Sequence, residues 1–129
     1  ISFNRFSLKR EDTMQQFLFE INKHDGSDAI SFTGSRKGVH EFALKQIVEN
    51  FEKFPIKFPY YLDRGTGYSS GRKMLSFESR DIEHPVSGTL PDGRTLYMDY
   101  RLSAKPDNLC AALTVLLEKA GWRVNARIL

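Results

Sequence analysis

The sequence predicts an α+β fold, in which three helices pack on one mainly antiparallel or mixed sheet as a single pair of layers. Segments with helical spacing of apolar residues are interspersed with segments that alternate apolar and polar residues. The middle of the chain, residues 56–102, holds consecutive strand patterns with no helix pattern between them, which favours antiparallel pairing. The 129 residues predict one compact domain, 1–129. A three-layer sandwich is the alternative.

The first part of the chain predicts a strand and then a helix. Ile1–Leu8 alternates, although Phe6 fits this pattern poorly. Asp12 can cap a helix reciprocally with Gln15, and Gly26 can end it. The apolar face of this helix, spaced i, i+3, i+4, i+7, is Met14, Phe17, Leu18 and Ile21.

A second strand, a second helix and an edge strand follow. Residues 28–33 predict a short strand. The helix runs from about Arg36 to Lys53, where Pro55 stops it. Its apolar stripe consists of Val39, Phe42, Ala43, Ile47, Phe51 and Phe54. Residues 56–62 are aromatic and apolar, and because Pro59 lacks an N–H donor we expect an edge strand or a bulge there.

The remaining elements are three strands, a helix and a last strand. Residues 74–80 alternate, and residues 86–90 and 94–102 flank the turn Pro91-Asp92-Gly93, which predicts a hairpin. A wide apolar stripe after Pro106 predicts a third helix, which Gly121 caps. Residues 122–129 alternate and predict a final strand.

Composition excludes several classes of protein. The net charge of +3 is too small for a dedicated polycation. A single cysteine, Cys110, excludes an internal disulfide and favours a reducing compartment, so we expect a soluble, cytoplasmic protein. No apolar run approaches the roughly 18 residues of a membrane span, so no membrane partner is expected.

The segment Gly65-Thr-Gly-Tyr-Ser-Ser-Gly-Arg-Lys73 contains the G-x-S-x-G pattern of hydrolases and resembles a phosphate loop in composition. Both interpretations require a helix directly after it, but residues 74–80 alternate as a strand does. The segment is therefore interpreted as a long hairpin loop. Its candidate partner-binding side chains are Arg64, Tyr68, Arg72 and Lys73.

Ser35-Arg36-Lys37 is a stronger candidate for binding an anion. It follows a predicted strand and opens a predicted helix, where free N–H groups, the helix dipole and two cations would converge. The alternative is that Ser35 only caps the helix and that both cations are solvated.

Acid/base chemistry has weak candidates in His40, Glu41 and His84. His40-Glu41 begins like the H-E-x-x-H zinc motif, but Leu44 occupies the position of the second histidine. No metal site, cofactor or catalytic residue is assigned.

These observations favour a small non-enzymatic binding domain. We expect a protein partner, as for an accessory, inhibitory or immunity-type protein, because the net charge is small and no nucleic-acid motif is present. The second hypothesis is a nucleic-acid or phosphate-binding protein that uses its basic loops. The third is a small transferase or nuclease that uses His40, Glu41 or His84.

Overall fold

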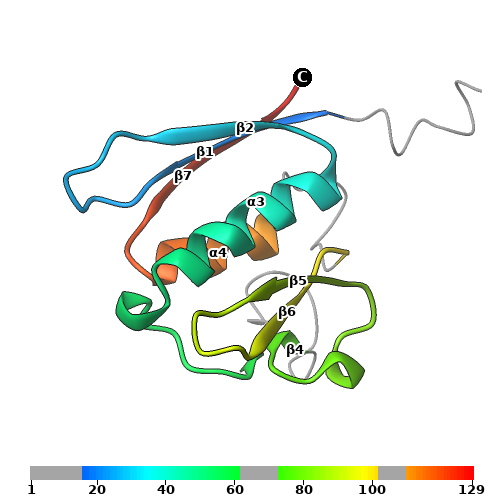
Figure 1. Cartoon of the computed structure of the whole chain (residues 1–129). Coiled ribbons are helices and arrows are strands. Elements are labelled where there is room, and N and C mark those ends of the chain that lie inside the picture. Colours follow the sequence, from blue (N-terminus) through cyan, green and yellow to red (C-terminus); the bar gives the residue numbers. More distant parts are fainter. Residues whose placement is uncertain (1–15, 62–72, 102–109) are drawn as a thin grey trace, which may run out of the picture.

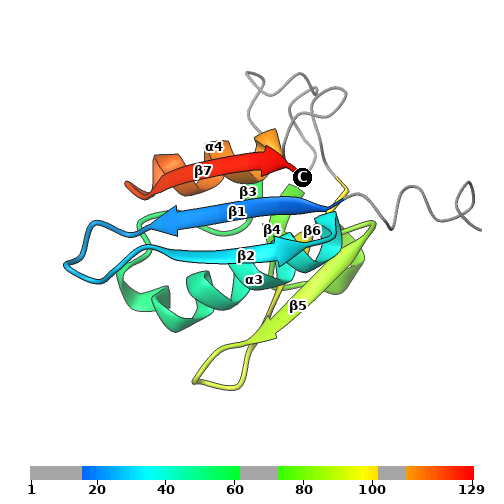
Figure 2. The same cartoon turned by 90° about the horizontal axis from the view of Figure 1, so that it is seen from above.

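The described part of the chain forms two antiparallel sheets with two α-helices between them. A computed structural model describes residues 16–61, 73–101 and 110–129. One sheet has the strand order β2-β1-β7 and the other β3-β4-β6-β5. Figures 1 and 2 show α3 and α4 lying between the two sheets. The α+β class is confirmed, but the single sheet is wrong, and the three-layer alternative describes the arrangement.

The first sheet contains both the earliest and the latest strand that the structure describes. Its strands are β1 (Phe17–Asn22), β2 (Ile30–Gly34) and β7 (Arg123–Ile128). The central strand β1 pairs antiparallel with both neighbours, so that Phe19 lies opposite Phe32 on one side and Ala126 on the other. The strands predicted over residues 28–33 and 122–129 are therefore confirmed, with small shifts of their ends.

The helix predicted from Asp12 is wrong over residues 17–22, which form β1. Phe17, Phe19 and Ile21 are buried, whereas Leu18, Glu20 and Asn22 are partly exposed, and this period of two is that of a strand. The predicted helical face, which consists of Met14, Phe17, Leu18 and Ile21, requires Leu18 to lie on the same side as Phe17 and Ile21. Leu18 points away from the helices, and Met14, like the predicted strand Ile1–Leu8, lies outside the described residues. The described part of the chain thus holds two α-helices rather than three.

The second sheet carries the predicted hairpin. Its strands are β3 (Tyr60–Tyr61), β4 (Lys73–Ser76), β5 (Pro85–Thr89) and β6 (Thr95–Asp99). The hairpin β5–β6 is confirmed, and Gly93 in its turn has a φ of 93°, a value that glycine adopts without strain. The strand predicted over 56–62 is reduced to β3. This strand lies at the edge of the sheet with a register shift, as Pro59 led us to expect.

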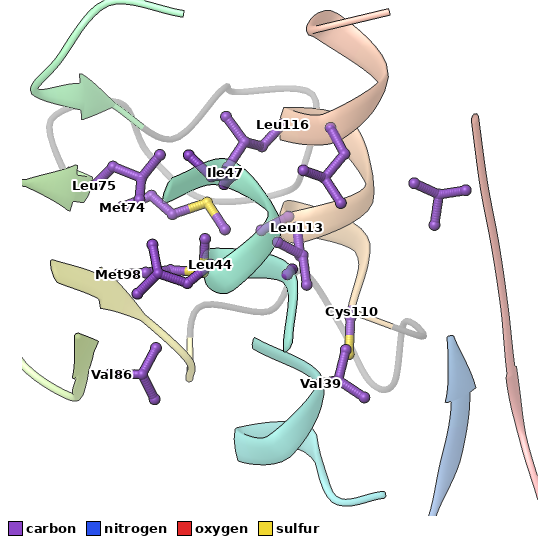
Figure 3. Packing of buried hydrophobic residues seen from close by; sticks show 14 of the residues in the cluster. Val39, Leu44, Ile47, Met74, Leu75, Val86, Met98, Cys110, Leu113 and Leu116 are labelled. Carbon is purple, nitrogen blue, oxygen red and sulfur yellow. The ribbon is translucent and has the colours of Figure 1, made fainter. Parts of the chain in front are cut away.

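The two helices form the middle of the shared core. α3 (Arg36–Glu49) continues into a 3₁₀ turn at Phe51–Lys53, and α4 (Ala111–Lys119) ends before Gly121, whose φ is 92°. Figure 3 shows Leu44 and Ile47 of α3 packing toward Leu113 and Leu116 of α4. The same core includes Phe19 and Ile21 from the first sheet, and Met98 and Leu75 from the second. Both sheets are therefore held together through the helices.

None of the described helices is long and apolar enough to cross a lipid bilayer.

Candidate functional site

Cations from two segments of the chain lie at the N-terminal end of α3. Ser35 is the N-cap, and its hydroxyl accepts a hydrogen bond of 3.1 Å from the N–H of Gly38. The predicted cap is therefore confirmed. Arg36 and Lys37 follow it in the first turn, which contains no acidic residue. The first turn of a helix has a partial positive charge, because its backbone N–H groups have no hydrogen-bond partner within the helix.

Tyr100, directly after β6, lies beside the first turn of α3. The Lys37 ammonium lies 5.7 Å from the centre of the Tyr100 ring, and the Arg101 guanidinium lies 5.9 Å from it. The His84 ring contacts the same ring edge-on, with a centroid distance of 6.2 Å. We call Lys37, His84, Tyr100 and Arg101 the Tyr100 cluster. Arg36 extends the positive charge toward the first sheet, where its guanidinium lies 5.8 Å from the centre of the Phe17 ring.

Hydrogen bonds of the Tyr100 and Arg101 backbone N–H groups hold this part of the Tyr100 cluster in position. The N–H of Tyr100 donates to the carbonyl oxygen of His84 over 3.0 Å, which joins the end of β6 to the beginning of β5. Asp99 is buried, and one of its carboxylate oxygens accepts from the N–H of Arg101 at 2.8 Å. The residues on either side of Tyr100 therefore occupy defined positions beside α3.

Three cations lie at this end of α3, namely Arg36, Lys37 and Arg101. Within the described ranges, no ion pair joins Arg36, Lys37 or Arg101 to a carboxylate. The nearest acids along the chain are Asp99, which is buried, and Glu41, which is exposed one turn after Lys37 on α3. These three cations are thus open to an anionic ligand, which would also meet the α3 dipole.

The predicted hairpin-loop site is only partly described. Arg64, Tyr68 and Arg72 lie outside the described residues. Lys73 opens β4, and its ammonium lies 3.1 Å from an Asp81 carboxylate oxygen that also accepts from the Ser76 hydroxyl at 2.7 Å. These contacts, the Ser76 hydroxyl first and Lys73 second, hold the pKa of Asp81 below its ordinary value. Lys73 thus holds Asp81, in the segment that follows β4, close to the sheet.

Among the described residues, no hydrogen bond joins His40, Glu41 and His84 to one another. His40 is fully buried, and its Nδ1 donates to the Arg36 carbonyl oxygen over 2.8 Å. Burial lowers the pKa of His40 from 6.5 to about 4, so the ring is neutral at neutral pH. Its Nε2 has no hydrogen-bond partner among the described residues. Glu41 is exposed, and His84 belongs to the Tyr100 cluster.

In the part of the chain that the structure describes, no three His, Cys, Asp or Glu side chains lie close enough together to hold a metal ion.

Two features of this region were not predicted. Tyr100 and Arg101 lie more than 60 residues from Lys37 in the sequence, and only the packing of β6 beside α3 brings them together. A pocket at the other end of α3 was missed as well, between Glu49–Lys53 and the turn of the β5–β6 hairpin. The sequence signal for this pocket was the pair Glu49 and Glu52, because acidic residues are unfavourable near the C-terminal end of a helix.

No protein-family model, curated protein or solved structure matches this chain.

Proposed function

We propose that this chain is a non-enzymatic binding domain that recognises an acidic segment of a protein partner at the N-terminal end of α3. The observation that carries the proposal is the convergence of Lys37 and Arg101 on one ring, with neither cation ion-paired within the described ranges. Tyrosine and arginine are also the residues that most often dominate protein interfaces. Carboxylates of the partner would bind to these cations and to the first turn of α3.

A protein partner is favoured over a nucleic acid by the distribution of the other cations. Lys73, Arg80 and Arg94 are each ion-paired, with Asp81, Glu78 and Asp92 respectively. A polyanionic strand is bound by a continuous series of available cations along its phosphates. The unpaired cations near Tyr100 instead form a local group, whose size suits a few carboxylates rather than a strand.

The proposal is tested with two short anionic probes of similar charge, a fluorescein-labelled hexaglutamate peptide and a labelled six-nucleotide thymidine oligonucleotide. We expect the peptide to bind at low ionic strength, as measured by fluorescence anisotropy. The double variant Lys37→Glu/Arg101→Glu should weaken this binding by about tenfold or more, which is roughly 1.4 kcal/mol. The reason is that two attractive charges become repulsive.

The matched control is Arg123→Glu/Arg127→Glu, which changes the net charge by the same amount. Arg123 and Arg127 are exposed on β7 in the first sheet, whereas Tyr100 and Arg101 follow β6 of the second sheet. When the variants are compared at about 0.15 M ionic strength, this control should retain peptide affinity within about twofold, since attraction between exposed charges more than about 8 Å apart is largely screened there. Equal losses in both variants would show diffuse attraction and contradict the proposal. Tighter binding of the oligonucleotide, weakened by both variants, would favour the nucleic-acid hypothesis instead.

A further inference from the structure

A pocket of about 410 Å³ lies at the C-terminal end of α3, at the opposite end of the helix from the Tyr100 cluster. The last turn of α3, the following 3₁₀ turn and the turn between β5 and β6 enclose it. Its lining residues are Val48, Glu49, Asn50, Phe51, Glu52, Lys53, Leu90, Pro91, Asp92 and Arg94. This volume falls within the range of sites that hold a small ligand or a large side chain.

The lining combines apolar surface with carboxylates. Leu90 is buried, and Val48 and Phe51 are half-buried, whereas Glu49 and Glu52 are exposed. A long basic side chain has the complementary structure, because its aliphatic stem packs on apolar surface while its charged end remains near water and carboxylates.

The charges at this end of α3 oppose the stability of the helix. A helix C-terminus has a partial negative charge, which basic residues normally offset. The last turn of α3 has no basic residue, and Glu49 ends the helix instead, with Glu52 in the turn that follows. No ion pair joins Glu49 or Glu52 to a cation within the described ranges. A ligand cation would explain why acids occupy these positions.

Arg94 is an arginine of the chain itself that packs at this surface. Its guanidinium lies 4.5 Å from the centre of the Phe77 ring and 5.6 Å from that of Phe51, and it forms a 2.8 Å ion pair with Asp92. Asp92 and Arg94 therefore neutralise each other. Lys53 is the remaining cation of the lining, so Glu49 and Glu52 leave an excess of one negative charge.

We infer that this pocket binds an arginine side chain of the protein partner. The stem of the arginine packs against Phe51, Val48 and Leu90, and its guanidinium pairs with the carboxylates of Glu49 and Glu52. A guanidinium suits the site better than an ammonium because it is planar and pairs with carboxylates through two parallel hydrogen bonds. This inference rests on the proposed function only in taking a protein as the source of the arginine.

The test is an NMR titration of the ¹⁵N-labelled chain with N-acetylargininamide and with its uncharged analogue N-acetylcitrullinamide. We expect saturable shifts of the backbone amides of residues 50–53 and 92–94 with the arginine compound, and binding at least about fivefold weaker with the citrulline compound. The double variant Glu49→Gln/Glu52→Gln should lose binding of the arginine compound by a similar factor. Its melting temperature should rise, because two unfavourable charges leave the end of α3.

The control variant Glu41→Gln/Asp28→Asn removes two exposed carboxylates that do not line the pocket, and it should bind like the wild type. Equal binding of the two compounds, or unchanged binding by Glu49→Gln/Glu52→Gln, would overturn the inference. The variant Lys37→Glu/Arg101→Glu should still bind N-acetylargininamide. Failure of the anionic site and failure of this pocket are therefore distinguishable.

Discussion

Replacing Phe19 with alanine should lower the free energy of unfolding by about 3–5 kcal/mol, the usual range for a fully buried phenylalanine. Phe19 lies in the central strand of the first sheet and is completely buried against the helices. Its removal leaves a cavity where that sheet packs on the shared core. Urea unfolding at neutral pH measures the difference, with an unchanged slope indicating that the denatured state is the same.

Leu18→Ala is the matched control, because its side chain is on the opposite face of β1 and only half-buried. We expect it to cost less than about 1 kcal/mol. A helix over residues 12–23 would give the reverse ranking, since Leu18 would then share the apolar face with Phe17 and Ile21, and Phe19 would lie off it. A larger loss for Leu18→Ala than for Phe19→Ala would contradict the strand.

His40 should make the stability of the domain depend on pH between about 6.5 and 4. The pKa of the buried ring is lower in the folded state than in the unfolded state. As the pH falls through this window, the unfolded chain binds a proton at His40 and the folded chain does not, so the free energy of unfolding decreases. The loss amounts to on the order of 3 kcal/mol and is complete near pH 4.

His40→Leu removes this dependence. Leucine has a similar volume, and it eliminates the Nε2 atom that has no partner among the described residues. The carboxylates titrate in both proteins, so the difference between the two curves of stability against pH isolates His40. We expect the variant to be at least as stable as the wild type at pH 7 and more stable by a growing margin down to pH 4. Parallel curves would contradict this account.

Local patterns predicted the elements whose apolar faces follow a single period. The hairpin around Gly93 and the helix that begins after Ser35 combine a strong turn or cap signal with a regular apolar pattern, and both are confirmed. Residues 17–22 match both periods, because Phe17, Leu18, Phe19 and Ile21 are all apolar. There the neighbouring strands decided the outcome, since β2 and β7 pair with both sides of β1.

The candidate site was predictable only where it is local. Ser35, Arg36 and Lys37 were found because a cap and two cations are consecutive in the sequence. Tyr100 and Arg101 could not be linked to them, because no sequence pattern states which strand end packs beside a helix. The arrangement of two sheets around the helices was equally hidden, since it depends on which strands pair across the chain.

The proposed binding face is tested most directly by titrating the ¹⁵N-labelled wild-type chain with the hexaglutamate peptide and mapping the shifted backbone amides. The account predicts saturable shifts concentrated at Arg36–Gly38, His84, Tyr100 and Arg101, where the first turn of α3 meets the Tyr100 cluster. Shifts concentrated on the outer face of the first sheet, around Arg123 and Arg127, or no saturable shift at low ionic strength, would contradict it.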